Sequence, residues 1–216
     1  AGWGGRVGRE RPGVPSRVTL LVRALERAGF DLGVVLRGGG TRDFGGFNPG
    51  VRRLAEQAIT CHRELPATGT GMATGRVGNI WDKGKAALVY LETDVTDPEG
   101  EPLWSTSAGL FLGGEGGWGG ERGPSNDWEA PARNPDHVVS YATRSDQALL
   151  YRLSGDRNPL HSDPTFASAA GFDTPILHGL CTYGFTGRAL LHATCGSDPA
   201  RFAGMSGRFK SPVTPG

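Results

Sequence analysis

The feature that most constrains this chain is a short loop that holds three polar side chains close together in the sequence. Asp156, Asn158 and His161 supply a carboxyl group, an amide and an imidazole. Gly155 precedes them and Pro159 lies among them, and a loop this short and stiff restricts the directions of its side chains, as proton transfer requires. The loop therefore predicts an acid–base pair formed by Asp156 and His161.

A helix is predicted to begin a short distance further on, in the sequence Leu177-His178-Gly179-Leu180. The first N–H groups of a helix have no partner within it, and they lie at the positive end of the helix dipole. Such groups can stabilise a negative charge that develops on a substrate. An acid–base loop followed by this helix start is the outline of an active site.

Both stretches resemble the signature of one family, the MaoC-type (R)-specific enoyl-CoA hydratases, also called hydratase 2. That signature has an aromatic residue, a hydrophobic residue and Ser, then Gly-Asp-x-Asn-Pro-hydrophobic-His, and later Gly-Phe-x-x-Pro-Ile-Leu-His-Gly-Leu. Every one of these positions is present in residues 151–161 and 171–180. The resemblance covers residues 57–125 and continues from 138 to the end, but it does not cover residues 1–45.

The resemblance implies reversible hydration of trans-2-enoyl-CoA to (3R)-3-hydroxyacyl-CoA, in the β-oxidation of acyl-CoA or of sterol side chains. Asp156 and His161 are expected to hold the attacking water, and the sequence leaves open which of them takes its proton. Asn158 is expected to fix the water or the histidine tautomer, and the N–H of Gly179 to meet the thioester oxygen. For His178, capping of the helix or anchoring of the loop is favoured over catalysis. No metal and no redox cofactor is required.

The periodicity of the sequence predicts an α+β protein built on an antiparallel sheet. Alternating and β-branched residues predict strands, and those strands are residues 32–36, 57–65, 72–80, 85–96, 103–112, 138–143 and 208–213. Helical spacing predicts helices at residues 17–28, 146–153, 164–170 and 179–194. The last of these is apolar nearly all round, so we expect it to be buried on most sides.

A sheet wrapped around a buried central helix is the hot-dog fold, and the resemblance implies a double hot-dog. We expect an N-terminal unit at residues 1–125, of which 1–45 are atypical and partly disordered, and a C-terminal catalytic unit at 126–216. The second unit has two predicted strands for its helix, whereas sheets usually have about four to six strands. We therefore expect it to be truncated at its C-terminal end, weakly stable, prone to associate and poorly active.

Two other motifs carry less weight. Residues 114–119 match the dinucleotide-binding pattern G-x-G-x-x-G, but a Pro- and Asn-rich stretch follows them instead of a helix, so a nicotinamide cofactor is not expected. The pairs His178–Cys181 and His192–Cys195 have the spacing of metal ligands. On one helix the two pairs lie about 21 Å apart, too far to share an ion. Burial of the cysteines is the preferred interpretation.

Four cations are candidates for contact with the phosphates of coenzyme A, with ordinary turn or strand-edge positions as the alternative. They are Lys83, Lys85, Arg208 and Lys210.

The charge of the chain is nearly balanced, with 23 basic and 22 acidic residues. This balance argues against a nucleic acid or a membrane surface as partner, and a cytoplasmic location is expected. The expected partner is the enoyl-CoA or 3-hydroxyacyl-CoA substrate, and a homodimer is compatible with the reading. The alternative is a non-catalytic hot-dog protein that binds acyl-CoA or assembles with a partner. The intact set of Asp156, Asn158 and His161 argues against it.

Overall fold

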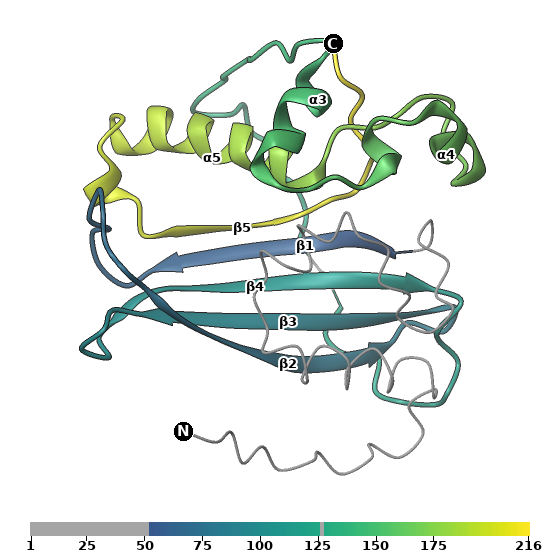
Figure 1. The fold of residues 1–216 in the computed structure, drawn as a ribbon, viewed down its shortest axis with the longest axis horizontal. Coiled ribbons are helices and arrows are strands. Elements are labelled where there is room, and N and C mark those ends of the chain that lie inside the picture. Colours follow the sequence, from purple (N-terminus) through teal and green to yellow (C-terminus); the bar gives the residue numbers. More distant parts are fainter. Residues whose placement is uncertain (1–51, 126–127) are drawn as a thin grey trace.

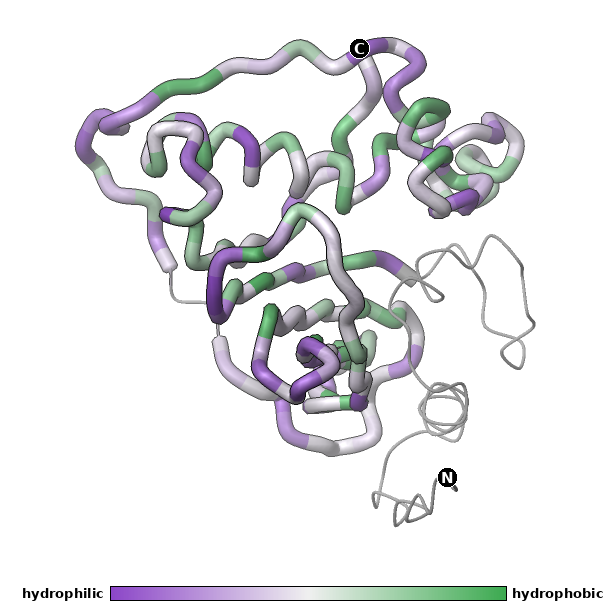
Figure 2. The backbone as a smooth tube through the Cα atoms, turned by 60° about the vertical axis from the view of Figure 1, so that its left-hand side comes forward, coloured by the Kyte–Doolittle hydropathy of each residue, from purple (hydrophilic) through white to green (hydrophobic). Residues whose placement is uncertain are grey.

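The computed structural model describes residues 52–125 and 128–216. The predictions of a helix at residues 17–28, of a strand at 32–36 and of partial disorder at 1–45 concern residues outside these ranges. The described chain forms one antiparallel sheet with a group of helices beside one edge (Figure 1). Hydrophobic segments are spread over the sheet and the helices alike (Figure 2).

The sheet has five strands in the order β2-β3-β4-β1-β5. Their bounds are β1 Arg52–Cys61, β2 Met72–Asp82, β3 Ala86–Thr96, β4 Pro102–Gly113 and β5 Gly204–Arg208. β2, β3 and β4 follow one another through short turns and pair antiparallel along most of their length, which confirms the predicted meander. β5 joins β1 from the far end of the chain, with Glu56 opposite Arg208 and Thr60 opposite Gly204.

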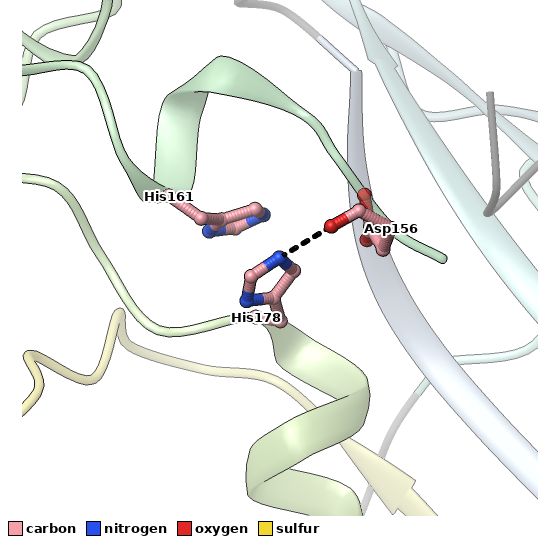
Figure 3. A group of neighbouring side chains, drawn as sticks. All are labelled: Asp156, His161 and His178. Atoms are coloured by element: carbon pink, nitrogen blue, oxygen red, sulfur yellow. Dashed lines mark hydrogen bonds between the residues drawn. The ribbon is translucent and has the colours of Figure 1, made fainter. Parts of the chain in front are cut away.

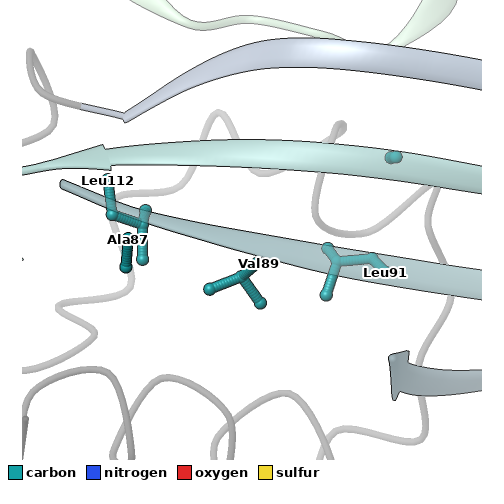
Figure 4. Close-up of a cluster of buried hydrophobic side chains, with 5 residues drawn as sticks. Ala87, Val89, Leu91 and Leu112 are labelled. Carbon is teal, nitrogen blue, oxygen red and sulfur yellow. The ribbon is translucent and has the colours of Figure 1, made fainter. Parts of the chain in front are cut away.

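One face of the sheet carries the larger apolar core. Because side chains alternate across a strand, Ala87, Val89 and Leu91 of β3 point to the same side and meet Ala108 and Leu112 of β4 (Figure 4). All five are essentially inaccessible to solvent. The core therefore fixes the register of the central strands, and with it the position of the neighbouring strand β1.

The helical part follows residue 145 and carries the candidate site. Its elements are α3 Gln147–Tyr151, the 3-10 turns η2 Arg152–Ser154 and η3 Pro159–His161, α4 Pro164–Ala169, α5 Gly179–Cys195 and η4 Pro199–Arg201. These confirm the helices predicted at 146–153, 164–170 and 179–194. α5 ends at Gly196, whose φ of 64° is the left-handed conformation that glycine adopts easily at a helix C-terminus. None of the helices in the described ranges combines the length and hydrophobicity of a membrane span.

Two predicted strands are wrong. Residues 138–143 pair with no described strand, and Val138 is 79% exposed, because a β-branched run forms a strand only where a partner edge is available. In place of the strand predicted at 208–213, the structure has β5 at Gly204–Arg208, which ends at the residue where the predicted strand was to begin. The N–H of Phe209 still donates to the carbonyl of Ala55 in β1, but the chain then leaves the sheet, and the carbonyl of Val213 accepts a hydrogen bond from the N–H of Leu177 at 2.7 Å.

The expected burial of α5 on most sides is also wrong for the described chain. Only Cys181 and Cys195 of this helix are buried, and Leu190 is 39% exposed. The physical reason is that β5 and the end of β1 contact one side of α5 and α3 and Tyr141 contact another, and these contacts leave side chains such as that of Leu190 exposed. Gly187 does allow close approach, since a Cβ there would lie 3.0 Å from Sδ of Met205, but Gly184 has open space around it.

Candidate active site

The acid–base loop lies between η2 and η3 and is held by hydrogen bonds of its own side chains. Gly155 turns the chain with a φ of 112°. The carboxylate of Asp156 accepts a hydrogen bond from the N–H of Asn158 at 3.1 Å. The amide oxygen of Asn158 then accepts from the N–H of Leu160 at 3.0 Å and so caps η3, whose first residue is Pro159. The loop is as restricted as its sequence predicts, and Asn158 acts here on the backbone.

Three side chains from two distant segments meet at this loop. Asp156, His161 and His178 each offer a ligand-type atom within 4.8 Å of the others (Figure 3). Asp156 is half-buried, while His161 and His178 are 9% and 1% exposed. The structure thus brings together the two residues that the sequence nominated as an acid–base pair, and it adds His178, whose side chain comes from the residue just before α5.

His161 has one ring nitrogen occupied and one free for chemistry. Its Nδ1 lies 2.7 Å from the carbonyl oxygen of Ile176, and since a carbonyl can only accept, Nδ1 carries the hydrogen. In the neutral ring Nε2 is then an acceptor. Burial lowers the pKa of His161, against the opposing effects of the Ile176 carbonyl and the Asp156 carboxylate. The imidazole is therefore poised to accept a proton at neutral pH.

Asp156 is shifted in the complementary direction. Burial raises the pKa of its carboxyl group, while the N–H of Asn158 and the nearby charge of His161 oppose the rise. Burial disfavours the charged form of both groups, so the pKa of Asp156 and the pKa of His161 shift toward each other. A proton can then pass between the carboxyl group and the imidazole at a small cost in free energy. That property is expected of an acid–base pair.

His178 anchors the loop and does not cap the helix. It occupies the N-cap position of α5, yet its side chain makes no capping hydrogen bond. Its Nε2 lies 3.1 Å from the main-chain oxygen of Asp156. Its ring stacks on that of His161 with centroids 3.8 Å apart, and it meets Tyr151 at 4.7 Å. Burial, reinforced by His161, lowers the pKa of His178 to about 4.

Gly179 is the first residue of α5 and presents a free backbone donor. No described residue accepts a hydrogen bond from its N–H. A Cβ at this position would lie 3.5 Å from Cδ2 of Leu54 and 3.6 Å from the ring of Phe209, which are ordinary contacts. Packing within the protein therefore does not require glycine here, and the missing side chain leaves room for a bound molecule to approach the N–H.

Two hollows border this region. A cavity of about 330 Å³ has His161 in its wall, together with Ser162, Thr174 and Pro175. A larger and mostly apolar groove of about 500 Å³ lies between α5 and the end of β1, where Ile59, Tyr183 and Met205 line it. None of Asp156, His161, His178 and Gly179 lines the groove, and of these four residues His161 alone lines the smaller cavity.

The candidate phosphate contacts do not form one cluster. Nζ of Lys83 donates to the carbonyl oxygen of Arg122, and Lys85 is exposed on the same turn between β2 and β3. Arg208 belongs to β5, at the opposite edge of the sheet, and donates to Glu56 at 2.5 and 2.8 Å. Lys210 is exposed just beyond it.

A shared metal ion does not suit the stacked histidines. Asp156, His161 and His178 are close enough to be considered as ligands, but a bound imidazole points its lone pair at the ion in the ring plane, about 2.0–2.1 Å away. The rings of His161 and His178 are stacked with centroids 3.8 Å apart and an interplanar angle of 28°, so their lone pairs lie in two nearly parallel planes and not in planes that cross at one ion. Nε2 of His178 is, in addition, engaged with the Asp156 carbonyl.

The glycine-rich stretch that matches a dinucleotide pattern has a structural explanation. The buried carboxylate of Asp82 accepts hydrogen bonds from the N–H groups of Gly84, Gly117 and Gly119 at 2.8–2.9 Å. These bonds lower the pKa of Asp82, the one from Gly117 most of all. The stretch therefore folds onto the turn between β2 and β3 instead of opening a helix for a pyrophosphate.

Comparison with known proteins identifies a family for residues 127–216. The family model of the MaoC like domain matches residues 127–216. The chain is 50% identical over 162 residues to "Enoyl-CoA hydratase ChsH3" of Mycobacterium tuberculosis, with 75% of this chain and 57% of that protein aligned. It is 48% identical to "3-hydroxyacyl-thioester dehydratase Y" of the same organism, over 82% of this chain and 63% of that protein.

A solved structure agrees with these relatives. The MaoC-like dehydratase of Phytophthora capsici is 40% identical, with a TM-score of 0.72 over 79% of this chain and 58% of that one. The chain thus spans about three fifths of the length of the relatives that it matches. The α+β hot-dog fold expected from the sequence is confirmed, and residues 127–216 of the chain match the MaoC like domain.

Proposed function

We propose that this protein adds water to trans-2-enoyl-CoA to give (3R)-3-hydroxyacyl-CoA, and that it catalyses the reverse dehydration. The observation that carries the proposal is the pair of half-buried Asp156 and buried His161, which His178 links to the free N–H of the next residue, Gly179. Two relatives named as an enoyl-CoA hydratase and a 3-hydroxyacyl-thioester dehydratase support it.

The reaction needs one group that takes a proton and one that gives a proton. A water molecule held between Asp156 and His161 attacks C3 of the enoyl thioester as one of the pair accepts its proton. The electron pair of the C2–C3 double bond moves onto the thioester, and C2 then receives a proton from the pair. The fixed Nδ1–H of His161 keeps Nε2 available for these transfers.

Negative charge builds up on the thioester oxygen between the two proton transfers. The N–H of Gly179 has no partner in the described chain and lies at the positive end of the α5 dipole, so it suits that oxygen as a donor. Because the thioester itself acidifies the C2 proton, this sequence of steps uses only side chains and a backbone amide.

Other parts of the function are proposed on less direct grounds. We propose that the catalytic unit comprises residues 126–216. Lys83 and Lys85 lie at the opposite edge of the sheet from Arg208 and Lys210, so we propose that one of these two pairs, and not both, meets the phosphates of a given coenzyme A. We further propose that the protein acts in the cytoplasm as a homodimer. Charge reversal at each cation, read as a change in KM for the CoA thioester, tests the contacts, and light scattering tests the dimer.

The competing function is a hot-dog protein that binds acyl-CoA without turning it over. Incubation of trans-2-enoyl-CoA with the protein separates the two, because hydration removes the absorbance of the conjugated thioester and binding alone does not. We expect the absorbance to fall linearly with time at first, at a rate proportional to the protein concentration, and then to reach an equilibrium value. Saturable binding with constant absorbance would instead establish the non-catalytic function.

A further inference from the structure

We propose that His178 is a positioning residue that holds Asp156, His161 and the N–H of Gly179 in one fixed arrangement. The inference rests on the proposed function and goes beyond it, because it assigns a task to a side chain that the reaction scheme does not use. It is argued from three contacts that His178 makes in different directions.

The first contact fixes the acid. Nε2 of His178 lies 3.1 Å from the main-chain oxygen of Asp156, so its hydrogen is donated to that carbonyl across 22 residues of sequence. The dashed line in Figure 3 marks this bond. It ties the backbone that carries the carboxyl group to the start of α5.

The second contact fixes the base. The ring of His178 stacks on that of His161 with centroids 3.8 Å apart. His161 is therefore held along its edge by the carbonyl of Ile176 and over one face by His178. Rotation of the His161 ring would break the first of these contacts and disturb the second.

The third link is covalent. Gly179 follows His178 directly, and its N–H is the proposed donor to the thioester oxygen. Whatever fixes the His178 backbone and side chain also fixes the place of that N–H relative to the acid and the base. One residue thus connects the three groups that must act on the same substrate.

An imidazole suits this task better than the alternatives. A phenylalanine could stack on His161 but would leave the carbonyl of Asp156 without its donor. A glutamine could donate to that carbonyl but would not offer a ring. Nδ1 of His178 is buried and has no partner among the described residues, a cost that an apolar ring would avoid. The cost is understandable if the Nε2–H bond is needed.

The test compares His178→Phe, which keeps a ring, with His178→Gln, which keeps a donor. A displacement of about 1 Å in a reacting group can lower turnover by roughly 10²-fold. We therefore expect kcat to fall by about 10–100-fold in each variant, with KM and the midpoint of thermal unfolding nearly unchanged.

Two controls separate positioning from general packing. Cys181→Ala removes a buried side chain from the cluster that Ala148 and Leu177 also form, one turn along α5. His192→Phe repeats the aromatic substitution at an exposed position of the same helix. Both should keep kcat within about twofold. Normal kcat in folded His178→Phe and His178→Gln, or a loss in kcat that Cys181→Ala matches, would overturn the proposal.

A readout without turnover distinguishes this proposal from the proposed function. The ring nitrogens of His161, observed by ¹⁵N NMR, should show a single tautomer protonated at Nδ1 in the native protein and a mixture in His178→Gln. If the native protein failed to hydrate enoyl-CoA but showed this difference, the function would be wrong and the positioning role would stand. An unchanged tautomer would refute the contact between His178 and His161 as a constraint.

Discussion

Acidification below pH 6.5 should destabilise this protein through His178. The side chain is 1% exposed, and its burial lowers its pKa from 6.5 to about 4 in the folded state. Between these two values the unfolded chain binds a proton that the folded chain excludes. The free energy of unfolding therefore falls as the pH falls through this window, and the contribution of His178 is complete above pH 6.5.

The size of the effect follows from the shift. At about 1.4 kcal/mol per pKa unit, a shift from 6.5 to about 4 corresponds to roughly 3 kcal/mol. The His161 pKa is lowered and the Asp156 pKa is raised, so these two groups contribute with opposite signs. Both are retained in His178→Phe, and the difference between native protein and variant isolates His178.

Urea unfolding of both proteins at a series of pH values from 7.5 to 4 measures this difference. The native protein should lose about 3 kcal/mol more than His178→Phe over the window. His137→Phe, the same substitution at an exposed position before α3, controls for the loss of one histidine from the sequence. Parallel stability curves for the native protein and His178→Phe would refute the conclusion that His178 is buried in its neutral form.

Three further substitutions test other parts of the account. Gly179→Val should raise the activation free energy of hydration by about 3 kcal/mol by blocking the approach to the N–H. Gly179→Ala, whose Cβ meets only ordinary contacts, should stay folded and lose less activity. Equal rates in both variants would show that the thioester oxygen binds elsewhere. Asn158→Ala removes the cap of η3 and should lower kcat clearly while the melting temperature changes little. An unchanged kcat would show that the cap is not needed for catalysis. Asp82→Ala removes the acceptor for three backbone N–H groups and should lower the melting temperature while kcat/KM of the folded fraction stays the same; an unchanged melting temperature would contradict the structural role of this carboxylate.

Local sequence signals were sufficient for much of the fold. The alternation in β3 and the turn residues on either side predicted the central strands, because these features act over a few residues. The limits of α5 were predicted within one residue, since Gly179 and Gly196 mark its two ends. β5 was misplaced because Gly204, Ser206 and Gly207 have little strand propensity, and only the edge of β1 makes them a strand.

The site was predictable where its residues are neighbours in sequence. Asp156, Asn158 and His161 share one loop, and their spacing, taken together with Gly155, Pro159 and the helix start that follows, indicated a common task. The involvement of His178 depends on how α5 packs against that loop, 17 and 22 residues away. No periodicity or spacing encodes such a contact, and the aromatic and carbonyl partners of His178 appear only when the two segments are placed in space.

The central claim is that Asp156 and His161 together hydrate an enoyl thioester. Its most direct test follows the product formed from trans-2-enoyl-CoA by the native protein, Asp156→Asn and His161→Ala, with chiral analysis at C3. We predict (3R)-3-hydroxyacyl-CoA from the native protein, and rates lower by about 10²–10⁴-fold in both variants at unchanged thermal stability. The same rate in either variant, or the (3S) product from the native protein, would contradict the account.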